Sequence, residues 1–170
     1  MLAAVAEPVR FADSEDEDDL LALCRAKHAE EGLRSASGRP FEFSEHKTRG
    51  TLQVALQARR NEPDAGQAWC GVLGARGQIQ GSVYLILQSP YDSEEMYLSQ
   101  LWSWIYPAYR RSPNAMALLM FSQKLALAIG VPMVGGVVSY CDGDAKLRFF
   151  RRNGCQPIAT LYSYNAAGAA

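Results

Sequence analysis

Ile105–Ala115 reads IYPAYRRSPNA, and this stretch decides the fold of the chain. The residues that lead into it, Met96–Tyr106, are rich in Tyr, Leu, Trp and Ile, which favour a strand. Ser112 suits a helix N-cap, and Pro113 suits the first helical position because an N–H there has no intrahelical partner. The pattern therefore predicts a strand that turns into a helix running to about Ile129.

The start of this predicted helix has the chemistry of an anion site. A helix N-terminus presents free N–H groups and the positive end of the helix dipole, and Arg110 and Arg111 stand directly before it. Together these groups suit a phosphate or a diphosphate. The alternative is an ordinary strand-to-helix turn with two solvated arginines, and these physical signals alone do not separate the two.

The same stretch carries a family resemblance. Residues 105–115, written I-x-P-x-Y-R-x-x-P-x-A, resemble the acyl-CoA-binding motif of the GNAT acetyltransferases, V-x-P-x-x-R/Q-x-x-G-x-G/A. Residues 150–155, FRRNGC, resemble the late Y-x-x-x-G-F signature of that family, and residues 9–13 followed by an amphipathic helix also fit. The resemblance spans nearly all 170 residues. It implies a GNAT-like acyl-CoA N-acyltransferase fold, an α+β domain whose central, mostly antiparallel twisted sheet is flanked by helices.

Hydrophobic spacing and turn residues predict further elements around one mixed sheet. The chain is expected to form a single domain over residues 1–170, with residues 1–8 and 166–170 as tails. The helix from Pro113 carries Leu118, Ser122, Leu125 and Ile129 on one face, a stripe typical of core packing. The other expected elements are a strand at 9–11, a helix capped by Asp13 or Ser14, a helix capped by Ser44, strands at 68–75 and 78–88 joined by a turn at Arg76-Gly77, a strand near 133–139, a short helix near 144–153 and a strand or hairpin around 156–164.

Composition argues against several classes of protein. A net charge of −1 gives no bulk attraction to nucleic acid. No apolar stretch is long enough to span a bilayer, and residues 1–8 lack the basic start of a signal peptide. The four widely spaced cysteines predict free thiols in a reducing, cytoplasmic compartment. With only two histidines, no metal site is expected.

The resemblance implies where acetyl-CoA, the expected donor substrate, would bind. In the family a bulge in the strand exposes backbone groups for the pantetheine arm, the diphosphate lies at the helix start, and a tyrosine of the last helix lies near the sulfur. The corresponding residues of this chain are Trp104 and Ile105, then Arg110, Arg111, Ser112, Asn114 and Ala115, and finally Phe150.

Acetyl transfer requires a deprotonated amine, a stabilised oxyanion and a leaving thiolate. Many GNAT relatives use a Glu of the strand as the base and a Tyr of the last helix as the acid. This chain has Ser99, beside Gln100, at the first position and Phe150 at the second. Pro113 also replaces a motif glycine and removes one N–H. The catalytic candidates are therefore Ser99, Gln100 and a substitute proton donor such as Tyr140.

Residues 13–19, DSEDEDD, hold six carboxylates in seven residues. They favour a solvated helix start, or alternatively a rim that attracts a cationic amine. Trp102 and Trp104 share a strand face, which favours core packing, with the wall of an acceptor pocket as the alternative.

The leading prediction is an acetyl-CoA-dependent N-acyltransferase acting on a small-molecule or protein amine. Because the Glu and Tyr positions of the family are not kept, a second hypothesis is a degenerate protein of this fold with a structural, assembly or CoA-binding regulatory role. A nucleotide-binding regulator is a third. A homodimer or a larger assembly is compatible with the sequence.

Overall fold

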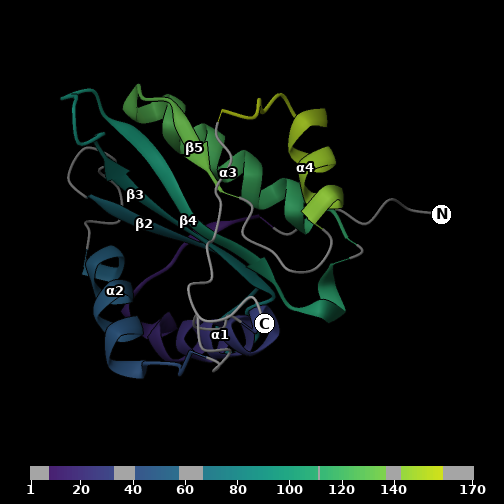
Figure 1. The fold of residues 1–170 in the computed structure, drawn as a ribbon. Helices are drawn as coiled ribbons and strands as arrows, with labels where there is room; N and C mark the ends of the chain where they lie inside the picture. Colours follow the sequence, from purple (N-terminus) through teal and green to yellow (C-terminus); the bar gives the residue numbers. More distant parts are fainter. Residues whose placement is uncertain (1–7, 33–40, 58–66, 111, 137–142, 159–170) are drawn as a thin grey trace, which may run out of the picture. The chain divides into compact units, whose positions relative to one another are not determined.

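The computed structural model describes residues 8–32, 41–57, 67–110, 112–136 and 143–158 (Figure 1). The chain divides into two compact units, Met1–Arg25 with Ser44–Gly136, and Ala26–Phe43 with Val137–Ala170. The first unit contains the sheet and most of the described helices. In the described part of the chain, no helix combines the length and apolarity that a membrane span requires.

The first unit is built on a five-stranded sheet whose strands follow one another in sequence order, β1-β2-β3-β4-β5. The first three junctions are antiparallel and the β4–β5 junction is parallel, which confirms the predicted mixed, mostly antiparallel sheet. The strands are Arg10–Phe11 (β1), Ala68–Leu73 (β2), Gly81–Gln88 (β3), Tyr97–Ile105 (β4) and Met133–Gly135 (β5).

Helices lie on both faces of this sheet, with α1 and α2 on one side and α3 on the other (Figure 1). Tyr84 of β3 donates a hydrogen bond to Thr51 O of α2 at 2.6 Å, which ties one face to α2. The helical segments are η1 (Ser14–Asp16), α1 (Glu17–Glu31), α2 (Glu45–Gln57), η3 (Pro107–Tyr109), α3 (Asn114–Ile129) and, in the second unit, α4 (Gly143–Arg152).

One hydrophobic core of the first unit lies between the sheet and α3. The predicted stripe on this helix is confirmed as core packing, because Leu118, Ser122 and Leu125 are all buried and Ile129 packs at its edge. The Ser122 hydroxyl donates to Leu118 O at 3.0 Å, so no buried donor is left without a partner there. The strand residues of this core are Trp69, Leu73, Val83, Leu85, Leu98 and Ile105.

The start of α3 differs from the prediction by one residue. Pro113 takes the N-cap position with φ −70° and ψ 4°, and the helix begins at Asn114. Ser112 is therefore not the N-cap, and Pro113 is not the first helical residue. The reason lies in the turn, where the Ser112 hydroxyl donates to Tyr109 O at 2.5 Å and accepts the N–H of Asn114 at 3.3 Å.

Most other predicted elements are confirmed with shifted ends. The β2–β3 hairpin is present, but its connection is longer than a tight turn, since Leu73 lies opposite Gly81. Ser44 caps α2 by accepting the N–H of Lys47 at 3.4 Å. The predicted last strand is not seen over residues 156–158, and its remainder lies outside the described residues. The described cysteines, Cys24, Cys70 and Cys155, are free thiols.

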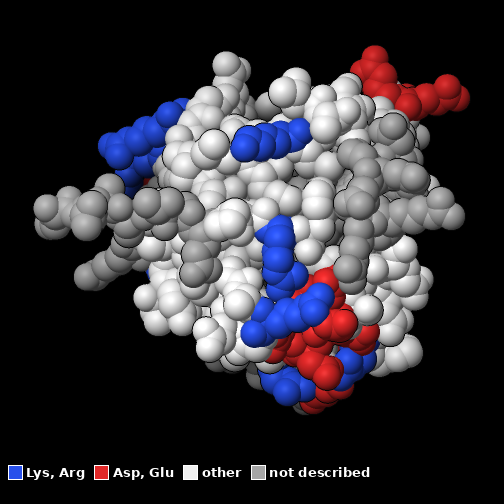
Figure 2. All heavy atoms as spheres, turned by 180° about the vertical axis from the view of Figure 1, so that it is seen from behind, with Lys and Arg blue, Asp and Glu red and all other residues white. Residues whose placement is uncertain are grey.

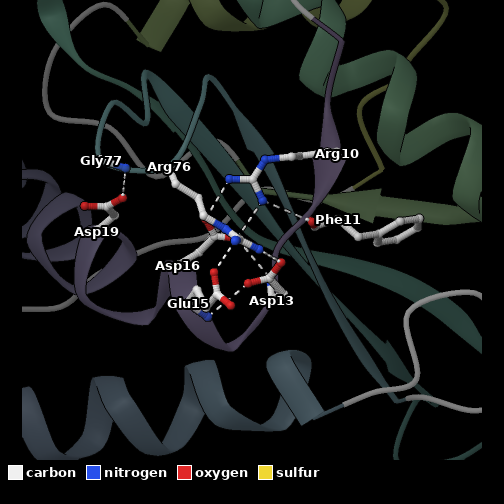
Figure 3. Close-up of polar contacts among 8 residues, drawn as sticks. All are labelled: Arg10, Phe11, Asp13, Glu15, Asp16, Asp19, Arg76 and Gly77. Carbon is white, nitrogen blue, oxygen red and sulfur yellow. Dashed lines mark hydrogen bonds and ion pairs between the residues drawn. The ribbon is translucent and has the colours of Figure 1, made fainter.

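The acidic run forms an ion-pair cluster centred on Asp16 (Figure 3). Asp16 is fully buried, and its two carboxylate oxygens each accept a hydrogen bond from Arg10 of β1 at 2.6 Å. Burial alone would raise the pKa of Asp16, but the Arg10 guanidinium and the N–H of Asp13 outweigh it and lower the pKa below its ordinary value. Asp13 in turn caps η1 by accepting the N–H of Glu15 at 2.9 Å.

The same cluster attaches the β2–β3 connection to the helix start. Arg76 pairs with Asp13 and Glu15, and the N–H of Gly77 donates to Asp19 at 2.6 Å (Figure 3). The predicted solvated helix start is therefore wrong for Asp13 and Asp16, which are buried and paired. The face seen in Figure 2 agrees, because red and blue side chains crowd together in one area instead of forming a purely acidic rim.

Candidate functional site

Strand β4 contains a bulge at Leu101. Tyr84 of β3 lies opposite Trp102, and the next residue, Leu85, lies opposite Gln100, so Leu101 is an extra residue in β4. A bulge of this kind bends the strand and increases its local twist. The bulge that the family resemblance implied is thus confirmed.

Beyond the bulge, β4 continues without β5. The two strands pair only from Leu98 to Gln100 of β4, and β5 ends at Gly135. Residues 101–105 of β4 therefore have no strand on that side among the described residues. We call this stretch the open edge of β4.

The hydrogen-bond alternation shows which backbone groups the open edge presents. The N–H of Tyr106 donates to Gln80 O at 2.9 Å, so this opposed pair is hydrogen-bonded. Because hydrogen-bonded and non-bonded pairs alternate along an antiparallel ladder, Trp104 directs its N–H and C=O toward β3. Ser103 and Ile105 direct theirs to the open edge. Of the two strand residues predicted to bind the donor, Ile105 therefore directs its backbone groups to the open edge and Trp104 directs its own to β3, while Ser103, which the sequence analysis did not name, shares the direction of Ile105.

The Arg110 side chain folds back over the end of β4. Its Nε donates to Ile105 O at 2.9 Å, and its guanidinium carbon lies 5.5 Å from the centroid of the Trp104 ring. Trp104 is buried and makes an edge-to-face contact with Tyr106, with ring centroids 4.8 Å apart. Trp104 therefore packs as predicted and provides a surface for the Arg110 guanidinium.

The first turn of α3 offers backbone groups rather than side chains. Asn114 is buried, and its side-chain amide donates to Gln80 Oε1 at 3.0 Å, which ties α3 to the end of the hairpin. Ala115 packs against the core. The N–H groups of Ala115 and Met116 have no acceptor within the helix, since they belong to its first turn. The predicted contributor Arg111 lies outside the described residues.

The two strand residues predicted as catalytic lie where β4 and β5 begin to separate. Ser99 is opposite Ile86 on one side and Val134 on the other, and it is half-buried. Gln100 is opposite Leu85 and Gly135, is buried, and directly precedes the bulge. The structure thus brings this pair next to the open edge.

The remaining candidates are Phe150 and Tyr140. Phe150 belongs to α4 in the second unit, where it is half-buried and makes an edge-to-face contact with Phe149 at a centroid distance of 5.4 Å. Tyr140 lies outside the described residues. No group of three or more His, Cys, Asp or Glu side chains within the described ranges could hold a metal ion.

A rigid aromatic pair lies beside the open edge, on the sheet face that α2 covers. Trp102 stacks on Tyr84 with ring centroids 4.5 Å apart and an interplanar angle of 26°. The Trp102 Nε1–H donates to Ser82 Oγ at 3.0 Å, which fixes the indole. Burial raises the pKa of Tyr84 to about 12, so this phenol stays protonated as a donor near neutral pH.

Comparison with protein-family models and with curated proteins finds no match. Solved structures do share the fold. An acetyltransferase of Trypanosoma brucei is 15% identical, with a TM-score of 0.63 and coverage of 92% of this chain and 96% of that one. A predicted acetyltransferase of Clostridium acetobutylicum, solved with acetyl-CoA, is 13% identical with a TM-score of 0.70, covering 92% and 94%. The aminoglycoside N-acetyltransferase AAC(6')-Iy, solved with a CoA-linked bisubstrate analogue, is 13% identical with a TM-score of 0.68, covering 92% and 95%. The chain has the fold of these acetyltransferases, which confirms the GNAT-like fold predicted from the sequence.

Proposed function

We propose that this protein is an N-acetyltransferase that moves the acetyl group of acetyl-CoA to an amine. The observation that carries the proposal is the open edge of β4, which begins at the Leu101 bulge and is followed by the N-terminus of α3. A pantetheine arm contains two amides, and such a chain pairs with an unpaired strand edge. Two of the structural neighbours were solved with acetyl-CoA or a CoA-linked analogue, which supports this choice of donor.

The groups present suit two parts of the donor, the pantetheine arm and the diphosphate. The outward N–H and C=O groups of Ser103 and Ile105 suit the pantetheine amides. The first-turn N–H groups of Ala115 and Met116 suit a diphosphate, and Arg110 adds a cation beside them. Binding therefore depends mainly on backbone groups, so it tolerates the departures of this sequence from the family motif.

The chemistry would be a direct transfer. The amine nitrogen attacks the thioester carbonyl, a C–N bond forms, the C–S bond breaks, and the amine proton passes to water. An outward N–H of the open edge, from Ser103 or Ile105, would donate to the developing oxyanion. The thiol of the donor has a pKa of about 8.5, so its thiolate leaves without an acid near neutral pH.

Neither strand candidate supplies a strong base. Ser99 and Gln100 are neutral, so they would orient the amine rather than remove its proton. The amine must then lose its proton to solvent before it attacks. We expect the rate of transfer to rise with pH up to the pKa of the acceptor amine.

The experiment is calorimetry with acetyl-CoA, followed by thiol release over a panel of amines. Ser103→Pro is the matched variant, because it removes one outward N–H and leaves the β3 ladder intact. We expect Ser103→Pro to keep its melting temperature within a few degrees and to weaken acetyl-CoA binding roughly tenfold, as the loss of a buried hydrogen bond would. Wild-type protein that binds no acetyl-CoA would contradict the proposal.

The alternative is a degenerate protein of the same fold, with an assembly or CoA-binding regulatory role. The observation that favours it is the pair of side chains Ser99 and Phe150, which stand where the family has a base and an acid. Binding of acetyl-CoA without thiol release on any amine would support a regulator. Absence of binding would support a structural role.

A further inference from the structure

We infer that Arg110 closes the open edge of β4 in the free protein and leaves it only for a donor that carries phosphate. Arg110 would thus be a specificity-determining residue that selects acetyl-CoA over shorter thioesters. The inference rests on the proposed function, because it concerns the same edge.

The first observation is the position of the Arg110 guanidinium. The outward C=O of Ile105 is the last acceptor that the open edge presents, and Arg110 Nε already donates to it at 2.9 Å. The guanidinium also lies 5.5 Å from the Trp104 ring centroid, a distance at which a cation is attracted to the ring face. These contacts hold the side chain across the end of the edge.

A bound pantetheine arm would use backbone groups of the open edge. A pantetheine amide that pairs with β4 as a strand does requires an N–H and a C=O from the edge. The N–H groups of Ser103 and Ile105 are directed to that side, but the C=O of Ile105 is occupied by Arg110. Because the Arg110 guanidinium already uses one lone pair of this oxygen and lies across the end of the edge, a pantetheine N–H must compete with Arg110 for it.

The start of α3 is the second place at which the Arg110 side chain can bind. Arg110 lies four residues before Asn114, at which α3 begins, so its long side chain serves both the strand end and the helix start. A diphosphate carries full negative charge and can accept two parallel N–H bonds from a guanidinium, whereas the carbonyl of Ile105 is neutral. A diphosphate at α3 therefore offers Arg110 a better partner than Ile105 O. A donor without phosphate offers Arg110 no such partner, so its pantetheine amides alone must displace the side chain from Ile105 O.

The experiment compares acetyl-CoA with S-acetylpantetheine, which has the same thioester and amides but no phosphate. Binding is measured by calorimetry for wild type, Arg110→Ala and Arg110→Met, the last of which keeps an apolar stem over Trp104. Lys124→Ala is the control, because Lys124 is an exposed cation farther along α3. Circular dichroism and melting temperature confirm that each variant is folded.

We expect both Arg110 variants to weaken acetyl-CoA binding roughly tenfold or more and to tighten S-acetylpantetheine binding roughly threefold or more. Lys124→Ala should change neither. A wild type that binds acetyl-CoA, together with S-acetylpantetheine binding that is unchanged, weaker or undetectable in both Arg110 variants, would overturn the inference and leave the proposed function standing. A wild type that does not bind acetyl-CoA would remove both.

A second measurement needs no variant. The Nε–H resonance of Arg110 in the free protein should exchange with solvent more slowly than that of Arg148, an exposed arginine of α4. Acetyl-CoA should shift the Arg110 resonance, because the side chain changes its acceptor. Exchange as fast as that of Arg148 in the free protein would overturn the inference, whatever the ligands do.

Discussion

Replacement of Asp16 by asparagine removes one negative charge from the centre of the ion-pair cluster and keeps the shape of the side chain. Asp16 is fully buried and accepts three hydrogen bonds, two from Arg10 at 2.6 Å and one from the N–H of Asp13 at 2.9 Å. An asparagine has one acceptor oxygen, and its NH₂ group would face a guanidinium nitrogen of Arg10. The variant therefore loses at least one charge-assisted hydrogen bond and leaves Arg10 without its counter-charge.

The expected cost follows from these contacts. A hydrogen bond to a charged group contributes about 1.5–3 kcal/mol, and removal of one partner of a buried ion pair costs about 3–5 kcal/mol. The Arg10 side chain is 35% exposed, so water compensates part of its charge and the higher range does not apply in full. We expect Asp16→Asn to lower the free energy of unfolding by about 2–3 kcal/mol, which is roughly 4–12 °C in melting temperature for a chain of this size.

The matched control is Asp18→Asn, which removes the same charge two residues away. The Asp18 side chain is 89% exposed and its ion pair with Arg49 spans 3.1 Å, so its loss should cost less than about 1 kcal/mol. Urea unfolding followed by circular dichroism measures both variants against wild type. An Asp16→Asn variant no less stable than Asp18→Asn would refute the reasoning.

Acid provides an independent check on the same residue. The pKa of Asp16 is lowered in the folded protein, so its contribution to stability is present above the unfolded pKa of about 3.9 and is lost as the pH falls through the lowered folded value. The stability difference between wild type and Asp16→Asn should therefore be full near neutral pH and shrink on acidification below a pH of about 4. A difference that stays constant down to the acid unfolding transition would contradict this account.

Two further substitutions test the donor site. Pro113→Gly fits the observed φ of −70° and restores an N–H beside the start of α3, so acetyl-CoA should bind roughly threefold more tightly, while stability falls by about 0.4–1 kcal/mol. Calorimetry and melting temperature measure the two effects, and weaker binding would show that this turn does not hold phosphate as the family does. Phe150→Tyr should speed thiol release if the new hydroxyl reaches the sulfur, an effect typically worth 10²–10⁴-fold when well placed. Lower melting temperature with no gain in rate on any amine would favour the non-catalytic alternative.

The unit of strand, turn and helix around residues 105–115 could be predicted because its signals are local. Aromatic and branched residues mark β4, and Pro107 and Pro113 flank the turn. The bulge itself leaves no such mark, since Leu101 is an ordinary strand residue and a bulge depends on the register with β3. Sequence analysis could therefore name Ile105, whose backbone groups are directed to the open edge, but could not show that Ser103, and not Trp104, shares this direction.

The ion pairs of the acidic run could not be predicted from local sequence signals. Six carboxylates within seven residues favour a solvated segment, and their partners Arg10 and Arg76 lie in β1 and in the β2–β3 connection. The signal that was available is the Asp13-x-x-Asp16 spacing, which permits a capping box and so ties the second carboxylate back to the chain. The partner of Asn114 could not be predicted either, because its side-chain amide is buried and donates to Gln80, a residue 34 positions earlier in the chain.

The two halves of the proposed reaction depend on different parts of this molecule. Donor binding would use backbone groups of β4 and α3, which are set by the bulge and by the strand register and do not require a particular side chain. Acid and base catalysis by the protein would require titratable side chains, and those at the expected positions, Ser99 and Phe150, do not titrate near neutral pH. A chain of this kind can keep its affinity for the donor while its turnover becomes slow. The ratio of acetyl-CoA affinity to thiol-release rate, measured with increasing pH, therefore separates a slow enzyme from a regulator. A rate that follows deprotonation of the acceptor amine would identify an enzyme without its own base, and a rate that stays at the hydrolytic background at every pH would identify a regulator.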